Sequence, residues 1–238
     1  MKDMKTRYLT ELRRMMSEIE LNEMDKIAHA GRIIGETIAA GKVVHVFGAG
    51  HSDIIALESF RRAGGLACIN RIYDPSLGFA ERIEGYGQAL VERYDLRPGE
   101  VLIVISNSGR NPVPIEVAAY AREKGLTVIA ITSLKHSISV NSRHSSGKKL
   151  YEIADIVIDN HGEIGDACVE VPRIPQRTGP TSTIIGSLVL NLIMIQATET
   201  CTELGKEAPI IVSQNLDGVD ERNRALYMRY RQRIGELF

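Results

Sequence analysis

Residues 101–111, VLIVISNSGRN, join an apolar strand to a polar loop. Val101–Ile105 is a run of five β-favouring residues, which is typical of a strand covered on both faces of its sheet. Ser106–Asn111 then carries small, hydroxyl and amide side chains, and a helical pattern opens near Pro114. A strand, a loop and a helix in this order indicate one unit of a parallel α/β sheet.

Similar apolar runs lie on both sides of this strand, separated by helical or turn-rich segments. We expect the other strands at residues 43–47, 66–72, 127–131 and 154–158, with a candidate last strand at 168–171. The predicted fold class is therefore α/β, a three-layer α/β/α arrangement. Its sheet is expected to be mostly parallel and five-stranded, in the flavodoxin-like order 2-1-3-4-5.

The chain before the sheet has apolar residues at helical spacing, so residues 1–41 are predicted to form an N-terminal helical segment. Residues 42–238 are expected to form the α/β domain with a C-terminal helical tail, and the two together one structural domain. The apolar stretch from Ile184 to Ile195 is too short to span a bilayer and is interpreted as part of a long buried helix, expected from after Pro180 to about Glu203.

Composition restricts the function classes. A net charge of −1 provides no global field for nucleic acid or an anionic membrane, so the charge of any anionic ligand must be met locally. Three scattered cysteines and the absence of an apolar leader indicate a reduced, cytoplasmic protein. We expect no cofactor, no metal, no nucleic acid and no membrane as partners.

The residues that follow the strands at 43–47 and 101–105 form the predicted ligand site. These strands flank the point where strand order reverses, and open sheets bind ligands there, beyond the carboxyl ends of their strands. Glycines let the backbone approach a phosphate, while serine hydroxyls and helix N-terminal N–H groups donate to it. Such a site needs no lysine, and no basic cluster lies nearby in the sequence. The predicted binding residues are Gly48, Gly50, His51, Ser52, Ser106, Asn107, Ser108, Gly109 and Asn111, with a third set at Thr181, Ser182 and Thr183.

Each of these segments has an alternative interpretation. Ser52, Ser106 and Thr181 are residue types that also cap helices. Gly48-Ala49-Gly50 begins a dinucleotide-binding fingerprint, but Asp53 stands at its third glycine, where a carboxylate would approach a pyrophosphate. A nicotinamide-dependent dehydrogenase is therefore a distant alternative.

The motifs VVHVFGAGHS, VLIVISNSGRNPVPIEVA, TVIAITS and ADIVIDN, in this order, resemble the SIS (sugar isomerase) domain family of phosphosugar-binding proteins. The resemblance covers roughly residues 42–203 and implies that Ser52, Ser106 and Ser108 hold a sugar phosphate. Asn107, Gly109 and Asn111 would lie alongside. Arg110 departs from the Thr or Ser that usually follows that glycine.

Further segments, among them GDACVEV and SQNLDGVDERN, resemble a bacterial branch of the family that is similar to phosphoheptose isomerases. The resemblance implies a homodimer or homotetramer built through helices, with a small sugar phosphate as ligand. It favours an aldose–ketose isomerase-like enzyme that works by general acid/base catalysis. The alternative is a non-catalytic, phosphosugar-sensing binding protein.

An isomerase needs a base that moves a proton α to a carbonyl. Glu58 and His51 are the catalytic candidates, Glu58 because apolar neighbours favour a raised pKa and His51 because it adjoins Ser52. Glu58 pairing with Arg61 or Arg62 on the surface is the alternative. His161, Glu163 and Asp166 suggest a polar turn rather than a metal site, and His144 lies in a loop of unassigned position.

Overall fold

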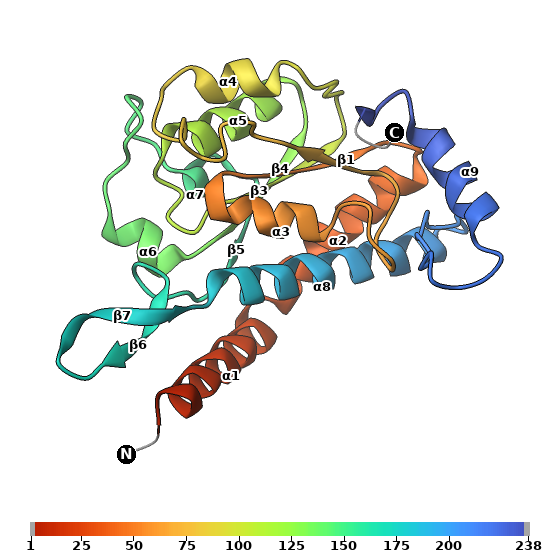
Figure 1. Cartoon of the computed structure of the whole chain (residues 1–238). Helices are drawn as coiled ribbons and strands as arrows, with labels where there is room; N and C mark the ends of the chain where they lie inside the picture. Colours follow the sequence, from red (N-terminus) through yellow and green to blue (C-terminus); the bar gives the residue numbers. More distant parts are fainter. Residues whose placement is uncertain (1–2, 236–238) are drawn as a thin grey trace.

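The five expected strands pair side by side in one parallel sheet, in the order β2-β1-β3-β4-β5 (Figure 1). The computed structural model describes residues 3–235, so the outer ends of the two predicted segments, residues 1–2 and 236–238, lie outside the described residues. The predicted fold class and strand order are confirmed. The strands are β1 Val44–Gly48, β2 Ile69–Ile72, β3 Val101–Ile105, β4 Thr127–Thr132 and β5 Ile156–Asp159.

Helices cover both faces of the sheet. Figure 1 shows α4 and α5 above it and α2 and α8 below it. Two of the helices precede the sheet, as expected. The helices are α1 Met4–Asn22, α2 Met24–Ala39, α3 Asp53–Glu58, α4 Tyr86–Val91, α5 Pro112–Glu123, α6 Leu134–Ser139, α7 Leu150–Ile153, α8 Ser182–Glu203 and α9 Asp220–Tyr230, with a 3-10 turn η1 at Gly50–Ser52.

Successive side chains of a strand point to opposite faces, and this alternation produces two apolar cores. Val44, Val46 and Ile103 pack with buried residues of α1, α2, α3, α8 and α9 on one face. Leu102 and Val104 pack with α4, α5 and α7 on the other. The N-terminal helices therefore share a core with the sheet.

α2 and α8 pack closely because glycines line their contact. A Cβ on Gly31 would lie 2.5 Å from Cβ of Gln196, and one on Gly35 would lie 2.6 Å from Cβ of Thr200. α8 has 22 residues and a mean hydropathy of 1.5, so by length and composition alone it could cross a membrane. That hydropathy is the mean over an 18-residue window of the helix, and half of this window is buried inside the structure, as in a core helix. The long helix expected from after Pro180 to about Glu203 is thus confirmed, as α8.

The candidate last strand at 168–171 forms outside the sheet. β6 (Ala167–Val171) pairs antiparallel with β7 (Ile174–Pro180) in a separate two-stranded ribbon. Nearly all of β7 is exposed, so the ribbon lacks the apolar residues of a covered strand. It extends beside α1 in Figure 1, where Tyr8 Oη donates a hydrogen bond of 2.6 Å to the carbonyl of Pro180.

The sequence from Ser52 to about Ala63 has a helical pattern that Gly64 would end, but the helix is shorter than this pattern predicts. It ends at Glu58, and the chain then turns, with Arg61 at a φ of 52°. Gly64 does not end this helix; its N–H donates to the carbonyl of Ile211 at 2.8 Å. A pairing with a distant segment, which local pattern cannot reveal, therefore fixes this turn.

Glu100 ties the amino ends of the strands to the C-terminal tail. Its buried carboxylate accepts hydrogen bonds from the Val43 N–H at 3.2 Å and from Arg233 at 2.8 and 3.0 Å. It also lies 3.0 Å from Nε2 of the fully buried His45. Burial raises the pKa of Glu100, but the hydrogen bonds from His45 and Arg233 outweigh it and lower the pKa to about 2.

We expect Glu100→Ala to lower the free energy of unfolding by about 3–5 kcal/mol, because it leaves Arg233 and His45 without their buried partner. Urea unfolding followed by circular dichroism measures the change. Glu207→Ala is the matched control, because Glu207 pairs with Arg222 but is 82% exposed. This substitution should lower the free energy of unfolding by at most about 1 kcal/mol. Equal losses in the two variants would contradict the role given to Glu100.

The low pKa of Glu100 also predicts a pH dependence of stability. Its contribution is fully present above the unfolded-state pKa near 4.5 and is lost as the pH falls towards 2. Glu100→Gln does not titrate, so its free energy of unfolding should fall less steeply than that of the wild type over this range. Urea midpoints at a series of pH values test this, and parallel curves would refute it.

Candidate functional site

The strand order brings the two predicted loops together. β1 and β3 are neighbours, with Gly48 paired to Ile105, and the order of strands reverses between them. The turns at 48–52 and 106–111 therefore leave the same edge of the sheet from strands about 4.8 Å apart. This edge, beyond the carboxyl ends of the strands, is where open α/β sheets bind ligands.

The turn after β1 is tight and requires its glycines. A Cβ on Gly48 would lie 2.3 Å from the carbonyl oxygen of Ser52, and Gly50 has a φ of 56°. Ser52 is half-buried, forms no side-chain cap on α3, and its hydroxyl bonds to no residue within 3–235. His51 is exposed. The capping interpretation is thus wrong for Ser52, and its hydroxyl remains available to a ligand.

The turn after β3 is held by its own side chains. Oγ of the buried Ser106 accepts a hydrogen bond of 3.2 Å from the Gly109 N–H. The carbonyl of Asn107 accepts from the Ser133 N–H at 3.0 Å, and its side chain accepts from Asn160 at 2.9 Å. These bonds rigidify the loop around Ser108.

Ser108 itself is left with unused donors. Its half-buried hydroxyl forms no hydrogen bond to another described residue. The N–H groups of Asn107, Ser108 and Arg110 likewise have no acceptor within the described part of the chain. These groups are donors at the position predicted for a phosphate.

The N-terminus of α5 offers fewer free N–H donors than the sequence suggested. Pro112 and Pro114 have no N–H, and the Val113 N–H donates to the carbonyl of Glu81 at 3.3 Å. The first turn of this helix therefore offers few free donors, and the loop before it must supply them.

The third predicted set begins α8, and Asp166 occupies its donors. The Asp166 carboxylate accepts from the N–H groups of Thr181 and Ser182 at 3.0 and 2.8 Å and from the Ser182 hydroxyl at 2.7 Å. Thr181 makes no side-chain cap on α8, so its capping interpretation is wrong as well. A ligand contact with Thr181, Ser182 or Thr183 stays a prediction and would require Asp166 to move.

The two catalytic candidates lie in different surroundings. Glu58, the last residue of α3, is 36% exposed and forms an ion pair with Arg62, four residues further along the chain, which is the arrangement of the surface alternative. Asp53, at the third fingerprint position, pairs with Arg71 of β2. The catalytic roles of Glu58 and His51 stay predictions.

The other polar residues singled out in the sequence have separate partners. His161 lies 3.6 Å from both Glu23 and Asp159, whereas Glu163 accepts from Lys135 at 2.7 Å. His144 lies 3.5 Å from Glu116 and lines a hollow of about 480 Å³ beside α5. Within residues 3–235 no group of three or more His, Cys, Asp or Glu side chains could hold a metal ion.

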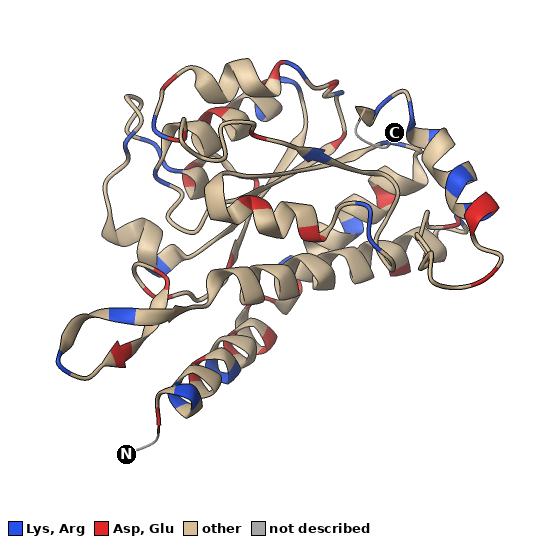
Figure 2. Cartoon of the chain, in the orientation of Figure 1, with Lys and Arg blue, Asp and Glu red and all other residues tan. Residues whose placement is uncertain are grey.

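The structure adds a basic cluster that the sequence did not indicate. Arg82, Arg110 and Arg143 come from three segments, and the pKa of Arg143 is lowered by burial and then by the positive charges of Arg110 and Arg82. Arg143 donates to Oδ1 of Asn111 at 2.9 Å. Figure 2 shows basic segments in the loop between α6 and α7 that carries it. Of the three, the sequence analysis noted only Arg110, which departs from the family pattern after Gly109.

Comparisons with known proteins agree with this architecture. The sequence profile of the SIS domain matches residues 7–133. A phosphoheptose isomerase from Francisella tularensis superposes with a TM-score of 0.55 at 16% identity, covering 82% of this chain and 95% of that one. The NanR protein of Vibrio vulnificus, solved with ManNAc-6P, gives 0.51 at 13%, covering 85% of this chain and 67% of that one. At such low sequence identity the similarity shows a shared fold only.

Closer relatives extend over nearly the whole chain. A UPF0309 protein of Shouchella clausii is 42% identical over 95% of this chain and 96% of its own length. A UPF0309 protein of Geobacillus kaustophilus is 41% identical over 97% and 95%. On this evidence, together with the strand order and the serine-bearing loops, the chain belongs to the SIS domain family and groups there with the UPF0309 proteins.

Proposed function

We propose that this protein binds a sugar phosphate, or a related carbohydrate derivative, between the turns at 48–52 and 106–111. The observation that carries the proposal is the pair of half-buried serine hydroxyls, Ser52 and Ser108, on neighbouring turns without a partner in residues 3–235. Polar groups in folded proteins are usually hydrogen-bonded, so unused donors gathered at a ligand-binding edge favour a ligand.

A phosphate suits this arrangement chemically. Its oxygens accept several short hydrogen bonds, and the N–H groups of Asn107 and Ser108 add donors on the same turn as the Ser108 hydroxyl. Gly109, with a φ of 57°, lets the loop turn without a side chain that would cover it.

We propose further that the protein is an aldose–ketose isomerase-like enzyme. Glu58 is the candidate base, and His51 the candidate group that exchanges protons with the sugar oxygens. For this role Glu58 must leave Arg62 when the ligand binds. The fold shared with phosphoheptose isomerases supports the proposal.

The alternative is binding without turnover. The structure of the NanR protein with ManNAc-6P favours it, because a similar fold there holds a sugar phosphate in a protein whose name states no reaction. Turnover of the ligand distinguishes the two functions.

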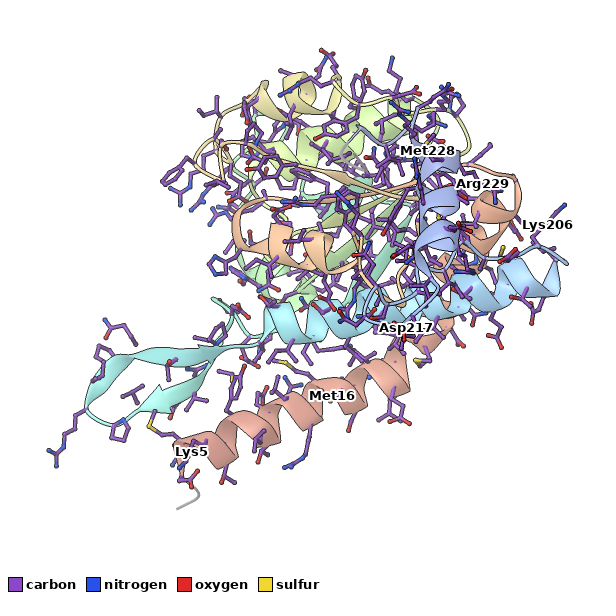
Figure 3. All side chains as sticks on the ribbon, turned by 45° about the vertical axis from the view of Figure 1, so that its right-hand side comes forward. Lys5, Met16, Lys206, Asp217, Met228 and Arg229 are labelled. Atoms are coloured by element: carbon purple, nitrogen blue, oxygen red, sulfur yellow. The ribbon has the colours of Figure 1, made fainter. Side chains whose placement is uncertain are left out.

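We also propose a cytoplasmic homodimer or homotetramer formed through helices, without nucleic acid or membrane as partner. Large apolar side chains are exposed on α1, α3 and α8, among them Met16, labelled in Figure 3, and Ile195, which are 41% and 65% exposed. A second copy of the chain would cover such surfaces. Light scattering of the purified protein measures the assembly.

A thermal-shift screen against a panel of sugar phosphates tests binding first, because a ligand that binds only the folded state raises the melting temperature. We expect Ser108→Ala to weaken binding of the best ligand by about tenfold or more, as a hydrogen bond to a charged phosphate is lost, while the melting temperature of the free protein stays the same. Calorimetry measures the affinity. Ser17→Ala, on the exposed side of α1, is the control. Unchanged affinity in Ser108→Ala would remove the serine loop from the site.

Glu58→Gln is expected to retain binding and to abolish turnover, since the amide keeps the shape of the side chain but cannot accept the proton. Proton nuclear magnetic resonance in deuterated water, which follows exchange at the carbon next to the carbonyl, is the measurement. Glu203→Gln at the exposed end of α8 should exchange like the wild type. Exchange that persists in Glu58→Gln eliminates Glu58 as the base.

A further inference from the structure

Three segments bring arginine side chains to one side of the serine loop. Arg110 follows Gly109, and its carbonyl accepts the Arg143 N–H at 2.8 Å. The segment that carries Arg82 is fixed against both elements. Its Glu84 accepts the Ser145 N–H at 2.6 Å, and the carbonyl of Glu81 accepts from the first turn of α5.

Among the described residues these three cations form no ion pair. Within residues 3–235 none of Arg82, Arg110 and Arg143 lies within 4.0 Å of an acidic oxygen, whereas Arg71 and Arg233 both do. Glu81 acts favourably on Arg143, but from beyond ion-pair distance. Like charges held together without counter-charges repel one another, so an anion in their midst would be stabilised.

Unpaired polar atoms gather at the same place. Among the six buried side-chain polar atoms without a hydrogen bond in the described residues, three are Arg110 Nε, His136 Nδ1 and Ser137 Oγ. Ser137 Oγ would lie 3.3 Å from a Cβ on Gly109, which places α6 directly against the serine loop. Burial, and then the charge of Arg110, lower the pKa of His136 against the opposing charge of Asp166, which favours a neutral imidazole with one N–H to donate.

This group of atoms lies on the side of the serine loop that is remote from the turn at 48–52. Ser52 follows β1 and Ser108 follows β3, whereas His136 and Ser137 lie on α6, which follows β4. At about 4.8 Å between strands, α6 stands on the order of 10 Å from the turn at 48–52 and about 5 Å from the serine loop. A phosphate held at Ser52 does not span the longer distance, but the two ends of a sugar phosphate do.

We propose that Arg110, Arg143 and His136 form a second anion subsite, so that the ligand is a sugar phosphate carrying a second acidic group, either a carboxylate or another phosphate. Arg82 adds positive potential from the exposed side. The inference rests on the proposed sugar-phosphate site, since it assigns the opposite end of the same ligand. It names an acidic phosphosugar as the substrate class.

Calorimetric titration with matched ligand pairs tests the subsite. 6-Phosphogluconate and glucitol 6-phosphate are both open chains and differ in a carboxylate against an alcohol at the first carbon, while fructose 1,6-bisphosphate and fructose 6-phosphate differ in the second phosphate. We expect the doubly acidic member of at least one pair to bind about tenfold more tightly or better. The pair that shows the larger ratio identifies the second group.

Variants separate this inference from the proposed function. Arg143→Gln and Arg82→Gln, both at exposed positions, should reduce the affinity ratio of the doubly acidic ligand to its partner towards one while changing monophosphate affinity by less than about twofold. Ser108→Ala should weaken all four ligands, and Arg32→Gln on the exposed side of α2 should change none. If the wild type binds both members of each ligand pair with nearly equal affinity, the second subsite alone is overturned. It is also overturned if Arg143→Gln weakens the singly and doubly acidic ligands equally. Absence of binding by all four overturns the proposed function with it.

Discussion

The parallel pairing of β1 with β3 is the constraint on which the site depends. Because Gly48 is in register with Ile105, the chain leaves both strands at the same height of the same edge. β2 and β4 then extend the sheet in opposite directions, so no crossover helix covers the space between these two turns. The covered, apolar strands make this edge rigid, and the donors of the loops can therefore be oriented before a ligand arrives.

The loops provide their donors in a way that differs from a simple helix N-terminus. α3 has six residues and α5 begins with two prolines in its first three positions, so neither helix offers a full turn of free N–H groups. The donors come instead from the irregular turns, which glycines at positive φ allow to fold tightly. Bonds from Ser106 and Asn107 hold the second turn in place without using the hydroxyl of Ser108.

Charge is organised locally in this nearly neutral chain. The long helix α8 has the N-terminus best suited to an anion, and the carboxylate of Asp166 already fills it. The arginines on the other side of the serine loop have no such internal counter-charge within the described residues. The protein thus neutralises the N-terminus of α8 with its own carboxylate and leaves the arginine cluster to an anionic ligand. An acidic phosphosugar has the second negative charge that this cluster would bind.

The sequence by itself determined the fold class, the strand order and the two turns at the reversal point, because strand periodicity, glycine placement and the motifs are local properties. Only the tertiary structure decided three further features. The strand at 168–171 joined a separate ribbon, since β7 lies nearby and the sheet requires covered apolar strands. Asp166 took the donors of Thr181 and Ser182. The arginine cluster forms from residues 82, 110 and 143, which are far apart in the chain. Such long-range contacts depend on how the loops fold over the sheet edge, and no local pattern encodes them.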